Sequence, residues 1–354
     1  MIEVGYVPYS KDLKHPGDRR RLGAWAKEHS IKLNTQRPLK SDVLVLSNAA
    51  DFSHWIKRAN QPIVLDLVDG YLGEKPSLIK DVFRNIVRSF GKTSNIKWLT
   101  YSRHVRTACK LSDAVVVASE EQRDLILPFN SNVIVIQDDH LEIDELYMSH
   151  ADKRQYGSNP KFPHIFWEGF GYTIKHFEFM SEQLDRFLWE SGWGMYFVTV
   201  EEFPRWGGYI GKVSTKKLIR KYFPRSWKSI VIIPWALDSL VEYAAKSEFA
   251  IIPINKTDKF AFYKSENKLL SMWHLGLPVI FSDTPAYSRV ANQMNFVGAV
   301  TKDSEWFSKL EFLSVTPDFR ELLATKGYEY IGKYHLHSDL MQKWDKTLYS
   351  LIPK

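Results

Sequence analysis

The first half of the chain alternates short apolar runs with segments whose apolar residues recur at helical spacing. Strands are predicted at residues 4–9, 43–47, 62–68, 114–118 and 133–137. Helices are predicted at residues 19–29, 51–60, 77–90 and 120–127. Continuous runs of Val, Ile and Leu are typical of strands that are buried on both faces. The alternation of strands and helices therefore predicts a parallel sheet flanked by helices.

A polar stretch at residues 149–163, with one glycine and two prolines, predicts a loop or interdomain linker. A second series of strands is predicted beyond it, at residues 165–167, 195–200, 230–233, 249–254, 278–281 and 297–300. The helices between them are predicted at residues 177–190, 237–246 and 267–274. The expected fold class is α/β, with two doubly wound domains. We expect an N-terminal domain at residues 1–150, a C-terminal domain at 151–335 and a final helix in 336–354 that crosses back to the first domain.

The length of 354 residues fits two domains, and the composition of 44% hydrophobic and 25% charged residues is typical of a globular protein. The single cysteine, Cys109, excludes an internal disulfide framework and a zinc site built from several cysteines. No apolar run approaches the roughly 18 residues of a membrane span. The first residues lack the pattern of a signal peptide, so we expect a cytoplasmic location.

The net charge of +7 is unevenly distributed. Residues 1–110 contain 20 Lys and Arg against 10 Asp and Glu, whereas residues 111–150 contain one against nine. A basic region predicts an anionic partner such as a phosphate, a nucleic acid or an acidic membrane surface. The aromatic residues do not cluster with the basic segment as a base-stacking platform requires, so we expect no nucleic acid partner.

The predicted helix at 77–90 has Lys80, Arg84 and Arg88 between apolar residues at helical spacing. Such a basic amphipathic helix suits an anionic membrane surface. The alternative is a helix packed on the sheet with a basic outer face.

The segment KSENKLLSMWHLGLPVIFS at residues 264–282 predicts a loop, an amphipathic helix, Gly276 and a buried strand that opens at Pro278. The N-terminus of a helix carries partial positive charge and unpaired N–H groups. With Lys264 and Lys268 beside it, this helix start would suit a diphosphate. The alternative is an ordinary helix–strand unit with solvated lysines.

The pattern N-K-L-x-x-x-x-x-x-G-x-P-V-I in this segment resembles the donor-sugar motif of the GT-B glycosyltransferases. It is most similar to the large retaining family that uses nucleotide-diphosphate sugars. Residues 165–171, IFWEGFG, resemble the first strand and glycine loop of the donor domain. Pro234-Trp235 and the later run FAIIP at 249–253 resemble its helix followed by a strand that ends in proline. The final helix at 338–351 resembles the one that crosses back to the first domain.

The resemblance implies two Rossmann-like domains facing a cleft, with a nucleotide sugar bound by the C-terminal domain and the acceptor by the N-terminal one. It implies a hexosyltransferase-like enzyme of polysaccharide or lipopolysaccharide biosynthesis that acts on a cell-surface glycan or lipid-linked acceptor. We expect no metal and no cofactor besides the nucleotide sugar, and a peripheral position on the inner face of the membrane. The implied donor-binding residues are Gly169, Gly171, Lys175, Trp235, Lys264, Glu266, Asn267 and Lys268.

One position departs from the family pattern. The family usually has a glutamate five residues before the motif glycine, where it holds the donor ribose, but this chain has Ser271 there. Glu266 could take over this role from the preceding loop. Trp235 could stack on the nucleotide base or be buried in the core. The serine also leaves open an inactive, transferase-like domain.

The loop after the first predicted strand is rich in ionisable residues. His15 and Asp18 could act in acid–base chemistry there, and alternatively Asp18 caps a basic helix in a solvated turn. Asp69, at the end of the predicted strand at 62–68, is the third catalytic candidate. Asp66 lies within the buried run of the same strand and is predicted to be structural. Asp138-Asp139-His140 belongs to an acidic stretch that we expect at the surface and not at a metal.

Two other functions fit the same observations. One is a nucleotide-sugar epimerase on the same fold, which would act on the donor without an acceptor. The other is a non-enzymatic, basic nucleic-acid-binding protein.

Overall fold

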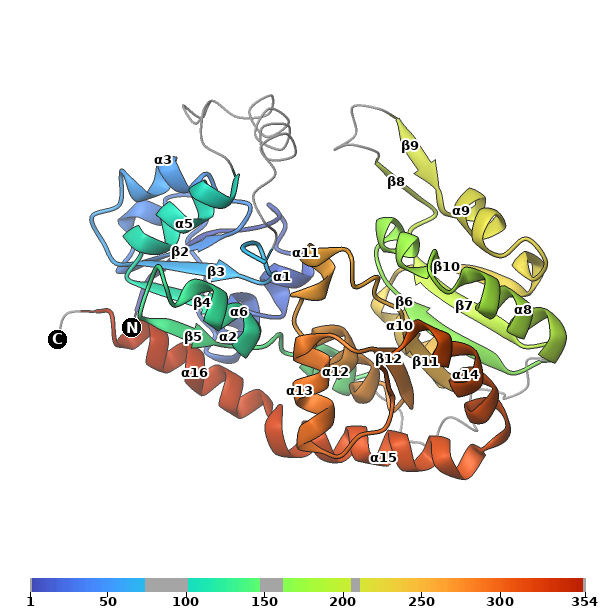
Figure 1. The fold of residues 1–354 in the computed structure, drawn as a ribbon. Coiled ribbons are helices and arrows are strands. Elements are labelled where there is room, and N and C mark those ends of the chain that lie inside the picture. Colours follow the sequence, from blue (N-terminus) through green and yellow to red (C-terminus); the bar gives the residue numbers. More distant parts are fainter. Residues whose placement is uncertain (1, 74–100, 147–161, 205–210, 353–354) are drawn as a thin grey trace. The chain divides into compact units, whose positions relative to one another are not determined.

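The computed structural model of the chain describes residues 2–73, 101–146, 162–204 and 211–352 (Figure 1). The predicted basic helix with Lys80, Arg84 and Arg88 lies outside these residues, as does most of the predicted linker. The chain forms two units, one of residues 1–139, 259–267 and 335–354 and one of residues 140–258 and 268–334. The first unit therefore includes a short segment from the middle of the expected C-terminal domain. In the described parts, none of the helices combines the length and the apolar character that a membrane span requires.

The first unit contains a five-stranded parallel sheet with the order β1-β2-β3-β4-β5. Its strands are β1 (Val4–Val7), β2 (Val43–Ser47), β3 (Ile63–Leu67), β4 (Ala114–Val117) and β5 (Val133–Val135). Asn34 forms an isolated parallel bridge to Gly5 of β1, which also pairs with Leu44 of β2. The chain after β1 thus passes first along one side of this strand and then adds all later strands on the other side, so the winding reverses at β1.

Helices cover both faces of this sheet. On one face, α2 (Leu22–Glu28) and α16 (His337–Tyr349) bury Trp25 and Trp344. The other face is covered by α3 (Phe52–Ile56), α5 (Tyr101–Leu111) and α6 (Glu120–Ile126). The short elements of the unit are α1 (Pro16–Arg19), η1 (Pro38–Lys40) and α11 (Lys259–Phe262). Covering of both faces is the doubly wound arrangement that the sequence predicted.

The second unit contains a six-stranded parallel sheet with the order β10-β7-β6-β11-β12-β13. Its strands are β6 (His164–Glu168), β7 (Gly194–Thr199), β10 (Ile230–Pro234), β11 (Phe249–Ile252), β12 (Val279–Ser282) and β13 (Ala299–Val300). Numbered along the chain, this is the Rossmann order 3-2-1-4-5-6. The strand order reverses between β6 and β11, and open sheets of this kind bind ligands outside the carboxyl ends of the strands at that point.

The second unit also has a small antiparallel hairpin, β8 (Glu202–Pro204) with β9 (Lys212–Ser214). Its helices are α7 (Leu141–Asp144), η3 (Gly171–Phe177), α8 (Ser181–Ser191), α9 (Thr215–Tyr222), η5 (Trp227–Ser229), α10 (Leu237–Ala245), α12 (Asn267–His274), α13 (Pro285–Gln293), η6 (Asp303–Glu305), α14 (Trp306–Val315) and α15 (Pro317–Tyr334). Figure 1 shows α9 beside β10, the edge strand of the sheet.

Candidate functional site

In the second unit, Lys268 lies at the carboxyl end of β6. Its Nζ donates a hydrogen bond to the carbonyl oxygen of Glu168 at 2.7 Å and lies 5.3 Å from the ring centroid of Trp167. Gly169 follows directly, and a Cβ added there would be 2.9 Å from Nζ of Lys268 and 2.8 Å from Trp167. The absence of a side chain at Gly169 therefore allows the lysine to approach the strand end, because any Cβ would collide with both neighbours.

The loop after β6 continues into η3 with several of the expected donor-site residues. A Cβ on Gly171 would come within 2.2 Å of the Phe203 ring, so this glycine also permits a close approach. The rings of Phe170 and Tyr172 stack with centroids 5.8 Å apart and are 52% and 46% exposed. Lys175 forms an exposed ion pair of 2.7 Å with Asp258, which follows β11. This pair connects the loops after β6 and β11, the two strands where the sheet order reverses.

Trp235 follows β10 in the second unit. Its backbone N–H donates a hydrogen bond of 3.1 Å to the carbonyl oxygen of Thr199 at the end of β7. The side chain is 37% exposed, so Trp235 is not a fully buried core residue.

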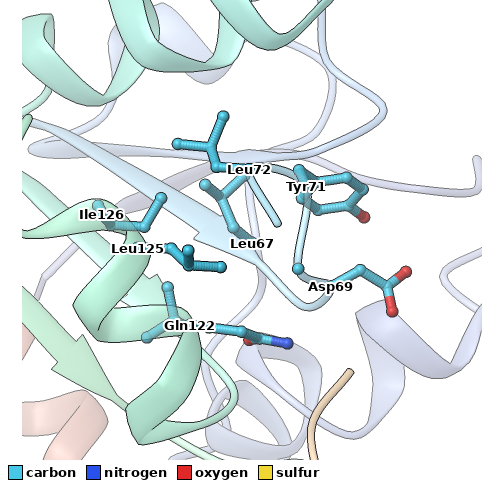
Figure 2. Close-up of a pocket in the computed structure, with 9 residues that line it drawn as sticks. Leu67, Asp69, Tyr71, Leu72, Gln122, Leu125 and Ile126 are labelled. Atoms are coloured by element: carbon cyan, nitrogen blue, oxygen red, sulfur yellow. The ribbon is translucent and has the colours of Figure 1, made fainter. Parts of the chain in front are cut away.

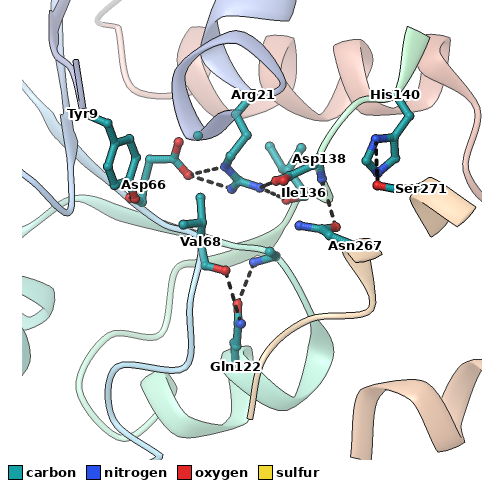
Figure 3. Close-up of polar contacts among 12 residues, drawn as sticks. Tyr9, Arg21, Asp66, Val68, Gln122, Ile136, Asp138, His140, Asn267 and Ser271 are labelled. Carbon is teal, nitrogen blue, oxygen red and sulfur yellow. Dashed lines mark hydrogen bonds and ion pairs between the residues drawn. The ribbon is translucent and has the colours of Figure 1, made fainter. Parts of the chain in front are cut away.

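Ser271, which occupies the position of the family's usual glutamate, is buried on α12. Its Oγ lies 3.4 Å from the ring nitrogens of the fully buried His140 (Figure 3). The His140 ring lies 5.2 Å from that of His274, whose Nδ1 pairs with Asp144 at 2.6 Å. The small serine side chain thus lies in a buried polar cluster of the second unit.

The expectation that Asp138, Asp139 and His140 lie at the surface was wrong. Asp139 and His140 are buried, and Asp138 is only 13% exposed at its side chain. The reason lies in their partners, because Arg21 pairs with Asp138 at 3.1 Å and His337 pairs with Asp139 at 3.1 Å. A buried carboxylate with a cationic partner avoids the full cost of an isolated charge.

The segment 259–267 places three expected donor residues in the first unit. Nζ of Lys264 lies 3.3 Å from a carboxylate oxygen of Asp69. Glu266 is fully buried and accepts a 2.8 Å hydrogen bond from the side-chain amide of Gln137. Asn267 Oδ1 accepts a hydrogen bond of 3.3 Å from the backbone N–H of Asp138 (Figure 3). The sequence did not predict these neighbours, since no local pattern connects them.

Gln122 ties the same segment to the end of β3. Its side-chain amide lies 3.4 Å from the carbonyl oxygen of Val68 and 3.3 Å from that of Tyr263, within hydrogen-bond distance of both. A small pocket lies beside it, with mainly apolar walls (Figure 2). Asp69 lines this pocket, with its carboxylate pointing away from the leucine side chains.

His15 caps the short helix α1 after β1. The backbone N–H of Gly17 donates to Nδ1 of His15 at 3.0 Å, and the imidazole stacks on Tyr9 with centroids 4.7 Å apart. Because Nδ1 accepts this hydrogen bond, the neutral ring has its proton on Nε2. Burial lowers the pKa of His15, an effect that the carboxylates of Asp18, Asp138 and Asp69 oppose.

Asp18 is fully buried and bonded on both carboxylate oxygens. One oxygen accepts from the Tyr6 hydroxyl at 2.7 Å and the Tyr9 N–H at 2.8 Å, and the other from the N–H and hydroxyl of Ser10, both at 2.9 Å. The Ser10 hydroxyl in turn accepts the N–H of His15 at 3.1 Å. These bonds fix the loop that presents His15.

No protein-family model and no curated protein sequence matches this chain. Solved structures do match over nearly its whole length. HepE from Anabaena, in complex with UDP and glucose, matches with a TM-score of 0.69 at 10% identity, covering 99% of this chain and 100% of that chain. The chain has the GT-B fold.

Two further GT-B structures support this result. Sucrose-phosphate synthase from Thermosynechococcus elongatus matches with a TM-score of 0.64 at 12% identity, covering 98% of this chain and 80% of that one. WaaG, a glycosyltransferase involved in lipopolysaccharide biosynthesis, matches with a TM-score of 0.56 at 10% identity, covering 97% of each chain. The expected GT-B architecture of two Rossmann-like domains is confirmed.

Arg21 is a central residue of the first GT-B unit that the sequence reasoning missed. It is fully buried, and its guanidinium binds Asp66 at 2.6 and 2.8 Å and Asp138 at 3.1 Å (Figure 3). It also donates to the carbonyl oxygen of Ile136 at 2.6 Å. The structural role predicted for Asp66 is thus confirmed. Arg21 interrupts the predicted helix at 19–29, which divides into α1 and α2 at this residue.

Proposed function

We propose that this protein is a glycosyltransferase that transfers a sugar from a nucleotide-diphosphate sugar to an acceptor. The observation that supports this most directly is Lys268 beside Gly169 at the point where the strand order of the second sheet reverses. HepE has the same fold, with a TM-score of 0.69 and 12% sequence identity to this chain. Its structure was solved in complex with UDP-glucose. We therefore take a UDP-sugar as the first donor to test.

On the donor side, Lys268, Lys175 and the N-terminal end of α12 would neutralise the diphosphate. Preorganised positive charge at the leaving group stabilises the charge that develops in the transition state, and we propose that it does so here without a metal ion. Trp235 would stack on the base, and the exposed Phe170 and Tyr172 would face the sugar near Gly171.

Lys264, Glu266 and Asn267 are further donor-site candidates because they belong to the same motif. In the first unit these residues are bonded to Asp69, Gln137 and the backbone of Asp138. Lys264 would bind a phosphate of the ligand in place of the Asp69 carboxylate. The loss of this ion pair would also free the Asp69 carboxylate.

On the acceptor side, His15 would donate a hydrogen bond from Nε2 to a substrate oxygen, and Asp69 would accept the proton of the acceptor hydroxyl. Asp18 would position His15 through Ser10, because its own carboxylate is occupied by internal hydrogen bonds. The excess of Lys and Arg in residues 1–110 supports an anionic acceptor, such as a lipid-linked or cell-surface glycan.

Release of UDP from UDP-glucose and other UDP-sugars, measured with and without lipopolysaccharide or lipid-linked acceptors, tests the proposal. We expect UDP release that depends on the acceptor and is lost in Lys268→Ala. Conversion of the donor to its epimer without an acceptor would indicate that the protein is an epimerase and not a transferase. Failure of every donor to react would contradict the proposal.

A further inference from the structure

A cationic surface lies in the second unit, on residues that are not among the candidate donor-site residues. Residues 212–228 contain seven lysines and arginines and no aspartate or glutamate. All seven are exposed, and together we name them the α9 basic face. They are Lys212, Lys216, Lys217, Arg220, Lys221, Arg225 and Lys228.

Helix α9 separates an inner face from a cationic outer face. Thr215, Ile219 and Tyr222 are buried on the inner face. Lys216, Lys217, Arg220 and Lys221 are exposed on the solvent side. Like charges three or four positions apart on a helix destabilise it, and Lys216 and Lys217 stand in this relation to Arg220 and Lys221. Within the described residues, the four cations of α9 form no ion pair, and on the whole α9 basic face only Lys212 has an acidic partner, Glu202 at 3.5 Å.

Trp227 extends this surface from α9 to η5. The guanidinium of Arg220 lies 4.4 Å from its ring centroid, and Nζ of Lys228 lies 5.8 Å from it. Tryptophan beside lysine and arginine is typical of side chains at the interface of a bilayer, where the ring lies at headgroup depth and the cations meet phosphates.

We propose that the α9 basic face docks on an anionic lipid bilayer. The cations provide charge complementarity to the headgroups, and Trp227 favours a bilayer over a nucleic acid. Stacking with bases requires an open aromatic face, but Arg220 and Lys228 lie over the ring of Trp227. This docking does not depend on the proposed glycosyl transfer, since none of its residues belongs to the candidate site.

Co-sedimentation of the full chain with phosphatidylcholine vesicles, with and without phosphatidylserine, tests the proposal. The test variant combines Lys216→Gln, Lys217→Gln, Arg220→Gln and Lys221→Gln. A matched control removes the same charge at four other exposed lysines, Lys32, Lys40, Lys302 and Lys333. Each cation near an anionic surface strengthens binding about fivefold, so we expect the α9 variant to bind at least about a hundredfold more weakly. The control should lose less than about tenfold.

Wild-type protein should bind only the anionic vesicles and should dissociate as the salt concentration rises. Absence of binding, or an equal loss in the control variant, would overturn the proposal. Tighter binding of a single-stranded RNA oligonucleotide than of the vesicles at the same salt would assign the surface to nucleic acid instead. The double variant Lys216→Gln/Lys217→Gln should weaken vesicle binding about 25-fold and provides a milder substitution if the fourfold variant does not fold. Donor binding should be unchanged in all variants, which separates this test from that of the proposed function.

Discussion

The ammonium group of Lys268 lies 2.7 Å from the carbonyl oxygen of Glu168, 100 residues earlier in the chain. This contact places the one lysine of α12 at the carboxyl end of β6. The lysine therefore has a defined position at the point where a Rossmann sheet binds its ligand.

Replacement of Lys268 by alanine should weaken the binding of UDP-sugars while leaving the fold intact. A hydrogen bond between a charged donor and a phosphate contributes about 1.5–3 kcal/mol, which corresponds to roughly a ten- to hundredfold change in Kd. Isothermal titration measures this. Lys256→Ala is the matched control, because Nζ of Lys256 also donates to a backbone carbonyl at 2.7 Å, that of Thr301. Equal affinity of wild type and Lys268→Ala would remove Lys268 from the donor site.

Gly169→Ala should reduce donor affinity by displacing the same lysine, because the new Cβ would be 2.9 Å from its Nζ. Gly332→Ala provides the control. Gly332 lies on α15, and a Cβ added there meets nothing within 4 Å. Alanine in place of a helical glycine should raise the stability by about 0.5–1 kcal/mol without an effect on donor binding. Donor titration combined with thermal unfolding distinguishes an effect on donor affinity from an effect on stability. Unchanged affinity in Gly169→Ala would indicate that the lysine position does not matter.

The activity should fall at acidic pH because of His15. Its pKa is lowered by burial from the usual value of 6.5, so the ring is neutral at pH 7. As the pH falls through this lowered pKa, a proton on Nδ1 would replace the hydrogen bond from Gly17 and disturb the loop. We therefore expect the acidic limb of the kcat profile to lie below pH 6.5.

His15→Phe should keep the stacking on Tyr9 but lose both ring nitrogens. We expect kcat to fall about a hundredfold or more, with unchanged donor affinity and without the acidic limb of the pH profile. A profile identical to that of the wild type would show that another group titrates.

Arg21→Met should destabilise the first unit by about 3–5 kcal/mol, since Asp66 would remain buried without its cation. Arg123→Met is the control, because Arg123 forms an exposed ion pair with Glu120 at 2.7 Å and such pairs contribute at most about 1 kcal/mol. Urea unfolding measures both changes. Similar losses in the two variants would contradict the central role of Arg21.

Elements with a strong local signal could be predicted from the sequence. The strand at 43–47 and the helix at 267–274 have the predicted bounds. The first is an apolar run buried on both faces, and the second ends just before Gly276, which has the left-handed conformation that commonly follows a helix. Gly169 directly follows β6, as expected of the glycine loop after the predicted strand at 165–167.

Long-range partners could not be predicted. Arg21, at the break in the predicted helix, pairs with Asp66 of β3 and with Asp138, which follows β5. The pairing of Lys264 with Asp69 depends on the membership of segment 259–267 in the first unit, for which no residue pattern gives a signal. Both require knowledge of the strand order, which is a property of the whole sheet.

The most direct test of the account is thermal unfolding of the wild type and of Lys268→Ala across a panel of nucleotide diphosphates and their sugars. A ligand at about 100 times its Kd adds about 2.7 kcal/mol to the stability of the state that binds it, which is a readily measured shift. We expect UDP or a UDP-sugar to raise the unfolding temperature of the wild type and Lys268→Ala to lose most of this rise. No shift with any nucleotide, or an equal shift in the variant, would contradict this expectation.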